Sequence, residues 1–184
     1  MLIHHSYFKV IFVGESNVGK TSIVNRLIKN EFSEDYALTI GGEYKVKNLD
    51  LGNSQTYQFQ IWDTAGQEKF RSIIRGFFRD SAIVFFTYSI GSKKSFDRLY
   101  SWLDETKEHT SSDAIFVLIG NKSDDHREVP YEDGMNFMKI NNLDTFFETS
   151  AKTGHNVNEV FEEAARLLVD KHEALEKIMR RKRA

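Results

Sequence analysis

The chain has 184 residues, of which 40% are hydrophobic and 28% charged, a composition typical of a single globular domain. Its net charge of −2 does not indicate nucleic acid as a main partner, and no apolar run approaches the length of a membrane span. The absence of cysteine excludes disulfides, thiolate metal sites and catalytic thiols, and it is compatible with a reducing cytosol.

A phosphate-binding pattern stands near the start of the chain. Residues 8–13 form an apolar run typical of a buried strand, and apolar residues at helical spacing follow from Ile23. The sequence between them fits the pattern G-x-x-x-x-G-K-[ST] and consists of Gly14, Glu15, Ser16, Asn17, Val18, Gly19, Lys20, Thr21 and Ser22.

Each fixed position of this pattern has a physical reason. Gly14 and Gly19 carry no Cβ, so the backbone can turn tightly and approach an anion. The loop N–H groups then converge on phosphate oxygens at the positive end of the following helix. Lys20 can reach the outer phosphates, and the Thr21 hydroxyl can ligate a bridging Mg²⁺. A glycine turn with a stray lysine is the simpler alternative, which the strand–loop–helix context disfavours.

The next segments predict a loop and a hairpin. Residues 31–42 are polar and irregular, whereas residues 44–51 and 57–62 carry apolar residues at strand spacing around a turn at 52–54. The second strand ends at Asp63, which we interpret as the carboxylate that holds Mg²⁺ in P-loop proteins; a helix or turn cap is the alternative. Gly66 offers a backbone N–H to a terminal phosphate, and Gln67 can align a water for in-line attack.

The second half of the chain alternates strands and helices. Residues 83–88 and 115–119 are continuous apolar strands, residues 96–103 carry a helical stripe, and a helix is expected from Pro130. A short strand at 146–147 precedes a last helix from residue 157, where Asn156 and Glu159 resemble a capping box. This order predicts an α/β fold with a doubly wound sheet, in which strand ends gather ligands along one edge.

Two further motifs follow strands and indicate a purine site. The carboxylate of Asp124, in the sequence Asn121-Lys122-Ser123-Asp124, can accept hydrogen bonds from N1–H and the amino group of guanine, a donor pair that adenine lacks. The Lys122 stem can lie over the base, and Asn121 can tie neighbouring loops together. The sequence Ser150-Ala151-Lys152 can add a backbone N–H to the guanine carbonyl and a second covering lysine.

Taken together, these motifs resemble the Ras superfamily of small GTPases, and the Rab branch most closely. The resemblance runs from about residue 8 to residue 168 and includes W-D-T-A-G-Q-E-K-F-R-S-I from Trp62. It implies a P-loop G domain over residues 1–170, with six mostly parallel strands, one antiparallel edge strand and five helices, followed by a basic extension of the last helix over 171–184. It also implies that Thr39 contacts Mg²⁺ and the γ-phosphate only in the GTP form. Phe32 would pack against guanine and Tyr36 would cover the phosphates, although from the residues alone both are equally compatible with loop anchors.

The Rab resemblance has consequences for partners. Tyr44, Trp62 and Phe77 are similar to the aromatic triad on which Rab effectors dock, whereas residues 39–44 and 79–81 depart from the usual Rab sequence. The resemblance implies effectors, an exchange factor, a GTPase-activating protein and a GDP-dissociation inhibitor as partners of a monomer, with no nucleic acid. A cytoplasmic protein is expected, on the cytosolic face of endomembranes if prenylated. Because the sequence has no cysteine, we expect that it stops before a lipidated tail; an unanchored protein is the alternative.

The sequence therefore predicts a GTP-binding switch that hydrolyses GTP to GDP and phosphate with Mg²⁺. Gln67, Lys20 and Thr39 are the expected catalytic residues, and Thr21, Thr39 and Asp63 the expected metal ligands. Two alternatives belong to other classes of protein. One is an interaction module that binds nucleotide without significant hydrolysis, and the other is a P-loop ATPase or kinase, against which Asp124 argues.

Overall fold

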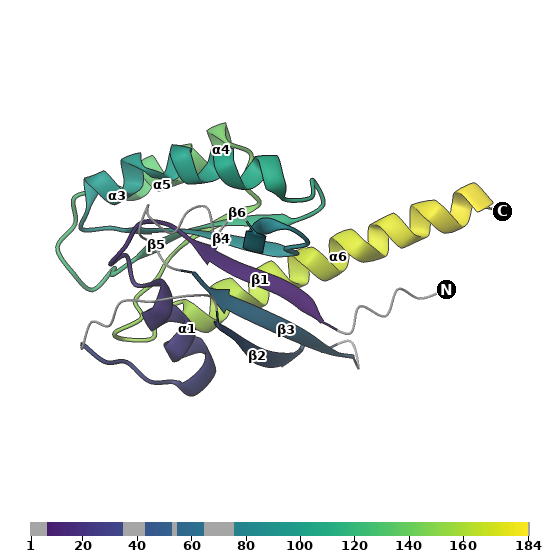
Figure 1. Ribbon diagram of the computed structural model, residues 1–184, viewed down its shortest axis with the longest axis horizontal. Helices are drawn as coiled ribbons and strands as arrows, with labels where there is room; N and C mark the ends of the chain where they lie inside the picture. Colours follow the sequence, from purple (N-terminus) through teal and green to yellow (C-terminus); the bar gives the residue numbers. More distant parts are fainter. Residues whose placement is uncertain (1–6, 35–42, 53–54, 65–75, 184) are drawn as a thin grey trace.

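The computed structural model describes residues 7–34, 43–52, 55–64 and 76–183. Six strands form one sheet in the order β2-β3-β1-β4-β5-β6 (Figure 1). The strands are β1 Phe8–Val13, β2 Glu43–Asp50, β3 Thr56–Asp63, β4 Ile83–Ser89, β5 Ile115–Asn121 and β6 Thr145–Glu148. Only β2 and β3 pair antiparallel, so the predicted hairpin and the mostly parallel sheet are confirmed.

Helices cover both faces of this sheet. In the described part of the chain they are α1 Lys20–Lys29, α3 Lys93–Asp97, α4 Leu99–His109, α5 Tyr131–Ile140 and α6 Val157–Arg183. In Figure 1, α3, α4 and α5 lie above the sheet, and α1 and α6 lie below it. The doubly wound α/β architecture is therefore confirmed, with these five helices in the described residues.

The alternation of the buried strands divides the core into two clusters. From β1, Val10 and Phe12 pack with residues of α1 and α6, whereas Ile11 and Val13 pack with residues of α3, α4 and α5. Successive side chains of a strand point to opposite faces, so a strand buried on both faces is apolar throughout. The continuous apolar runs in the sequence reflect this double burial.

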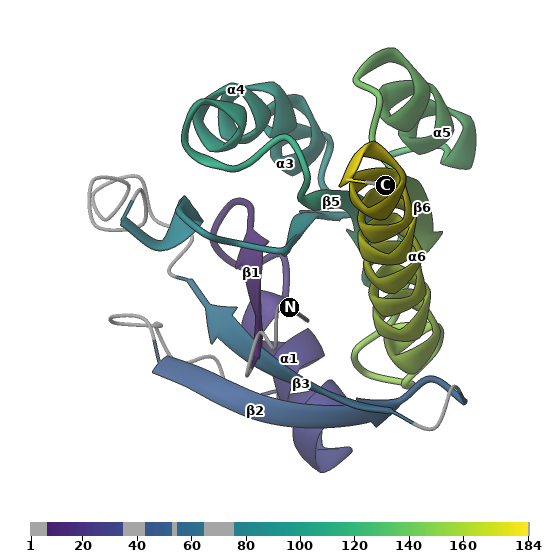
Figure 2. The ribbon, with the colours of Figure 1, turned by 90° about the vertical axis from the view of Figure 1, so that its right-hand side faces the viewer.

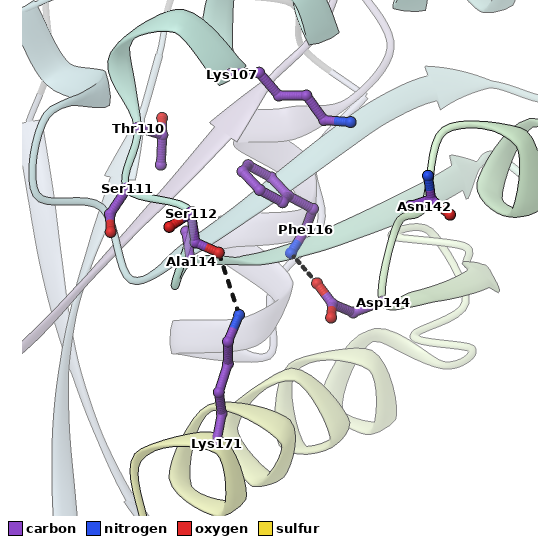
Figure 3. A pocket seen from close by; sticks show the side chains of 9 residues that line it. All are labelled: Lys107, Thr110, Ser111, Ser112, Ala114, Phe116, Asn142, Asp144 and Lys171. Carbon is purple, nitrogen blue, oxygen red and sulfur yellow. Dashed lines mark hydrogen bonds between the residues drawn. The ribbon is translucent and has the colours of Figure 1, made fainter. Parts of the chain in front are cut away.

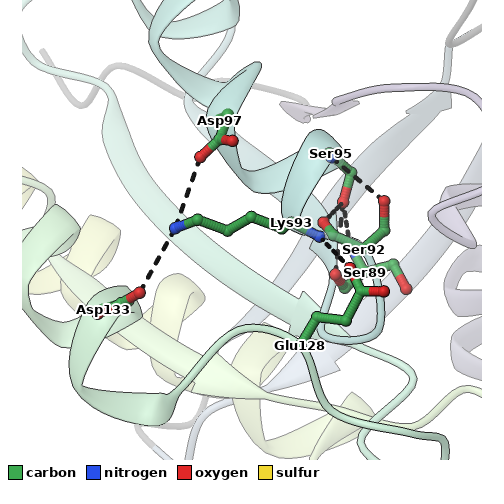
Figure 4. A network of polar contacts seen from close by, with 7 residues as sticks. All are labelled: Ser89, Ser92, Lys93, Ser95, Asp97, Glu128 and Asp133. Carbon is green, nitrogen blue, oxygen red and sulfur yellow. Dashed lines mark hydrogen bonds and ion pairs between the residues drawn. The ribbon is translucent and has the colours of Figure 1, made fainter.

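The helical stripe at residues 96–103 belongs to two helices, because the chain breaks at Arg98 between α3 and α4. Ser92 caps α3 by accepting a hydrogen bond from Ser95 N. Lys93 then fixes the short helix against its neighbours, as Figure 4 shows: its N–H donates to Glu128 Oε2 at 2.8 Å, and its ammonium lies 3.5 Å from Asp97 and from Asp133. These contacts extend from α3 to α5.

The last helix runs from residue 157 to residue 183 and extends past the sheet (Figure 1), so its carboxyl end faces the viewer in Figure 2. The expected capping box at its start is wrong: Asn156 has φ 55° and donates through Nδ2 to Glu148 O at 2.9 Å, whereas an N-cap has an extended backbone. Among the described residues, no helix combines the length and the apolar character that crossing a membrane requires.

Two lysines of the edge strand β2 reach across to α1. Lys45 Nζ donates to Asn25 Oδ1 at 2.6 Å, and Lys47 Nζ donates to Leu27 O at 2.9 Å. The hairpin is thereby tied to the helix that follows the glycine-rich loop.

Candidate functional site

The sequence motifs gather at the carboxyl ends of the parallel strands. The glycine-rich loop follows β1, Asp63 ends β3, Asn121 ends β5, and residues 149–152 follow β6. Because β1, β3, β4, β5 and β6 are parallel, these four segments meet at one edge of the sheet.

The glycine-rich loop is held by close backbone contacts. Gly14 has φ 142°, and a Cβ at this position would lie only 2.1 Å from the backbone oxygen of Thr87 on β4. Gly19 has φ 96°, and its Cβ would lie 2.3 Å from Asn121 Nδ2. Asn17 takes a left-handed conformation as well, with φ 64°. Both glycines are therefore required by space as well as by conformation.

Lys20 begins α1 and bends back over the loop. Its ammonium donates to Gly14 O at 2.9 Å and to Glu15 O at 2.8 Å, and its side chain is only 5% exposed. Burial lowers the pKa of Lys20 to about 8, although the charges of Asp63 and Glu15 oppose this shift. A phosphate group beside this lysine would supply the countercharge that favours its protonated form.

Asp63 and Thr21 form a pair that fits a divalent cation. The Asp63 carboxylate is buried and accepts a hydrogen bond from the Thr21 side chain, yet its Oδ1 has no hydrogen-bond partner among the described residues. Burial raises the pKa of Asp63, whereas Thr21, Lys20 and Lys45 act to lower it. An unsatisfied buried oxygen is costly, and Mg²⁺ prefers carboxylate and hydroxyl oxygens together with water and phosphate. The described residues contain no cluster of three or more His, Asp or Glu that could hold a metal by themselves.

Asn121 connects three loops of the site. Its side chain is 1% exposed, and its Nδ2 donates to Val18 O in the glycine-rich loop at 2.9 Å. Its Oδ1 accepts hydrogen bonds from Thr149 Oγ1 at 3.1 Å and from Ala151 N at 3.2 Å. One amide side chain thus fixes the spacing between the two expected guanine loops and the phosphate loop.

Asp124 and Ser150 meet beside this connection. Ser150 Oγ donates to Asp124 Oδ1 and accepts a hydrogen bond from Thr153 N at 3.1 Å, so the exposed carboxylate is oriented by a buried serine. Lys122 has φ 65°, a conformation that turns the chain sharply between Asn121 and Asp124. The arrangement presents a fixed acceptor to a ligand that offers paired N–H donors.

Further contacts surround the loop after β6 and the start of the segment that follows α1. Arg26 of α1 donates to Ala151 O at 2.9 Å and to Lys152 O at 2.8 Å, so it fixes the loop after β6 to α1. Lys152 itself pairs with Glu34 Oε1 at 2.9 Å. Phe32 is half-buried against the core cluster of α1 and α6, a contact that fits the loop-anchor alternative. Nothing near Arg26 in the sequence indicates its contacts with this loop.

Tyr36, Thr39, Gly66 and Gln67 lie outside the described residues. Ser16 in the glycine-rich loop and Ser22 in the first turn of α1 are half-buried.

Three aromatic side chains lie together on the β2–β3 side of the site. The ring of Trp62 lies 5.1 Å from that of Tyr44 and 5.1 Å from that of Phe77, between centroids. Tyr44 is 49% exposed, and Val46 beside it on β2 is also exposed. The three residues singled out in the sequence therefore form one partly exposed aromatic surface.

A separate cavity of about 400 Å³ lies at the amino end of β5, remote from these loops (Figure 3). Lys171 of α6 donates to Ser112 O at 3.4 Å across it, and Phe116 N donates to Asp144 Oδ2 at 2.7 Å. None of the predicted site residues lines it.

Comparison with known proteins gives the same assignment as this geometry. The Ras family model matches residues 9–170. The chain is also 41% identical over 165 residues to the Ras-related protein Rab-11C of Dictyostelium discoideum, an alignment that covers 89% of this chain and 71% of that protein. The chain therefore belongs to the Ras family of small GTPases and stands close to the Rab branch.

Proposed function

We propose that this GTP-binding switch hydrolyses GTP to GDP and phosphate with Mg²⁺, and that effectors bind only its GTP form to control a step of membrane trafficking. The family establishes guanine-nucleotide binding and a general trafficking role. The observation that carries the finer proposal is the arrangement at the sheet edge. There, Asn121 joins the phosphate loop to both guanine loops, beside the unsatisfied Asp63 oxygen.

The residues divide into phosphate, metal and base contacts. The N–H groups of residues 14–19 and the Lys20 ammonium hold the outer phosphates, and Phe32 and Tyr36 close over the nucleotide. Thr21 and Asp63, with Thr39 in the GTP form, would hold Mg²⁺, which would supply positive charge beside the phosphates. Asp124 accepts hydrogen bonds from guanine, Lys122 and Lys152 cover it, and the backbone of residues 150–152 meets its carbonyl.

Hydrolysis depends on Gln67, which positions the attacking water. Thr39 follows Thr21 by only 18 positions, which leaves no room for an inserted domain that carries an arginine. Turnover should therefore be slow, on the order of 10⁻⁴ to 10⁻³ per second. A partner that supplies an arginine should accelerate it by up to ~10⁵-fold. Loss of the γ-phosphate then releases Thr39 and Gly66, which changes the surface that partners recognise.

Single-turnover release of phosphate from bound GTP tests this activity. The Gln67→Leu variant should still bind GTP but release phosphate at least about tenfold more slowly, because the water is no longer aligned. Equal rates in both proteins would exclude the proposed role of Gln67. Tight GTP binding with no release by the wild-type chain would favour the non-hydrolysing interaction module.

Base recognition has its own test. Asp124→Asn should lower GDP affinity on the order of 10²- to 10⁴-fold, because two hydrogen bonds to a charged acceptor are lost. The same variant should gain affinity for xanthosine diphosphate, whose base offers an acceptor where guanine offers an amino donor. Unchanged preference for GDP in a direct competition would contradict the assignment of Asp124.

A further inference from the structure

The glycine-rich loop contains an acid where the proposed ligand is an anion. Glu15 follows Gly14 directly, and the general pattern leaves its position variable. A carboxylate close to phosphate oxygens is unfavourable, more so in a site that excludes water. The loop can serve phosphate binding only if this side chain is directed elsewhere.

Trp102 of α4 provides a partner that directs it elsewhere. The indole Nε1 donates to Glu15 Oε1 at 3.0 Å, between residues 87 positions apart in the chain. Trp102 is only 1% exposed and belongs to the core cluster of α3, α4 and α5. A hydrogen bond to a charged acceptor is stronger than one between neutral groups, and this one is partly buried.

The backbone of the same residue is fixed from another direction. Glu15 O accepts the 2.8 Å hydrogen bond from Lys20 Nζ, and the preceding Gly14 lies against the Thr87 backbone. The first half of the loop is therefore held by β4, by α4 and by the start of α1. Of these contacts, the hydrogen bond from Trp102 is made to the Glu15 side chain.

We propose that Trp102 is a positioning residue for the outer-phosphate site. Its N–H holds the Glu15 carboxylate on the α4 side of the loop, which keeps the charge away from the phosphates and keeps the loop N–H groups directed at them. This inference rests on the nucleotide binding proposed above. According to this inference, a residue of α4, which lies outside the loop motifs, contributes to phosphate binding.

The test compares nucleotides with and without an outer phosphate. Calorimetry on the full chain would measure the affinities for GDP and GMP in the wild type and in Trp102→Phe, Glu15→Ala, Glu15→Gln and the double variant Glu15→Ala with Trp102→Phe. Tyr100→Phe is the matched control, because it removes one polar group from an exposed side chain of the same helix.

Trp102→Phe should lower GDP affinity about tenfold and GMP affinity no more than about twofold, since a charge-assisted hydrogen bond is lost. In the Glu15→Ala background, the same substitution should cost less than about twofold. Glu15→Ala should bind GDP several-fold more weakly than Glu15→Gln, because both are uncharged and only glutamine offers an oxygen to the indole. Tyr100→Phe should match the wild type.

A purely structural role for Trp102 predicts a different pattern. An equal cost of Trp102→Phe in both backgrounds, or equal GDP affinity of Glu15→Ala and Glu15→Gln, would overturn the inference while leaving the proposed function intact. If Trp102→Phe does not fold, the GDP affinities of Glu15→Ala and Glu15→Gln are sufficient to test the inference. The indole ¹⁵N–¹H resonance of Trp102 should move in Glu15→Ala more than in Glu15→Gln, which a packing role would not require. A wild-type chain that binds no GDP would instead overturn the proposed function as well.

Discussion

The loop at residues 14–19 and the loops at residues 121–124 and 149–152 are stabilised in different ways. In the first, the backbone of Gly14 lies against the backbone of β4, and carbonyl groups accept hydrogen bonds from Lys20. In the second, side chains make the connections, with Asn121 at the centre and the Ser150–Asp124 bond beside it. The phosphate end therefore requires glycines that leave room for close backbone contact, whereas the guanine end is connected by side chains.

This difference determines what a substitution can do at each end. Adding a single methyl group should damage the phosphate end, because backbone atoms cannot move aside. Removing the Asn121 amide should weaken the guanine end. It should also weaken the phosphate end, because the hydrogen bond to Val18 O is lost. An exposed ion pair at the rim should matter least at either end.

The largest effect is expected from Gly14→Ala. The new Cβ would lie 2.1 Å from Thr87 O, so the loop and β4 must separate, at a cost of roughly 3–5 kcal/mol of folding stability. Thermal unfolding of the nucleotide-free chain would measure it. Gly52→Ala is the matched control: Gly52 also has a positive φ of 81°, but its Cβ would meet nothing within 4 Å. Similar losses in the two variants would show that conformational strain, and not the contact with Thr87, explains the cost.

Asn121→Ala should come next. It removes three hydrogen bonds worth about 1 kcal/mol each, which corresponds to roughly a 10²-fold loss of GDP affinity. Dissociation of a fluorescent GDP analogue would measure this loss. Asn48→Ala is the control, because Asn48 is exposed on the edge strand and accepts a single hydrogen bond of 3.4 Å from Gln58. If Asn121→Ala weakened the binding of guanosine alone and left the binding of the phosphates unchanged, it would contradict the role of the Asn121–Val18 hydrogen bond in connecting the guanine loops to the phosphate loop.

The smallest effect concerns the ion pair between Glu34 and Lys152, which are both exposed. Glu34→Gln should accelerate GDP release about twofold at low salt and less at high salt. The pKa of Glu34 is lowered by its bond to Lys152, so the pairing is complete above the ordinary glutamate pKa and is lost as the pH falls through the lowered pKa. The difference between wild type and variant should therefore disappear in acid. The charge-reversed double variant, Glu34→Lys with Lys152→Glu, should restore slow release, and failure to do so would exclude the pair as the cause.

The sequence predicted those features that arise from local patterns. Apolar alternation gave the hairpin, continuous apolar runs gave the strands that are buried on both faces, and Gly14 and Gly19 marked a loop that needs close backbone approach. Strand ends in a parallel sheet share an edge, so the convergence of the motifs also followed from the sequence.

Features that depend on distant partners could not be predicted in this way. Arg26 acts on residues about 125 positions away, and nothing near it in the sequence indicates that contact. The ion pair between Lys152 and Glu34 joins residues 118 positions apart, and no motif indicates it. The break at Arg98 was missed because the helical stripe continues across it without glycine or proline. Asn156 had the sequence signature of a cap, but its side chain bonds the backbone of Glu148.

The lysines of β2 have a consequence for association between molecules. An outermost strand offers unpaired N–H and C=O groups on which another chain can add a strand, and charged side chains, lysine above all, discourage such addition. Lys45 and Lys47 sit on the longer of the two border strands, with their ammonium groups engaged by α1. A strand from another molecule would have to pair beside these two lysines, which opposes edge-to-edge aggregation. The aromatic surface of the hairpin stays accessible.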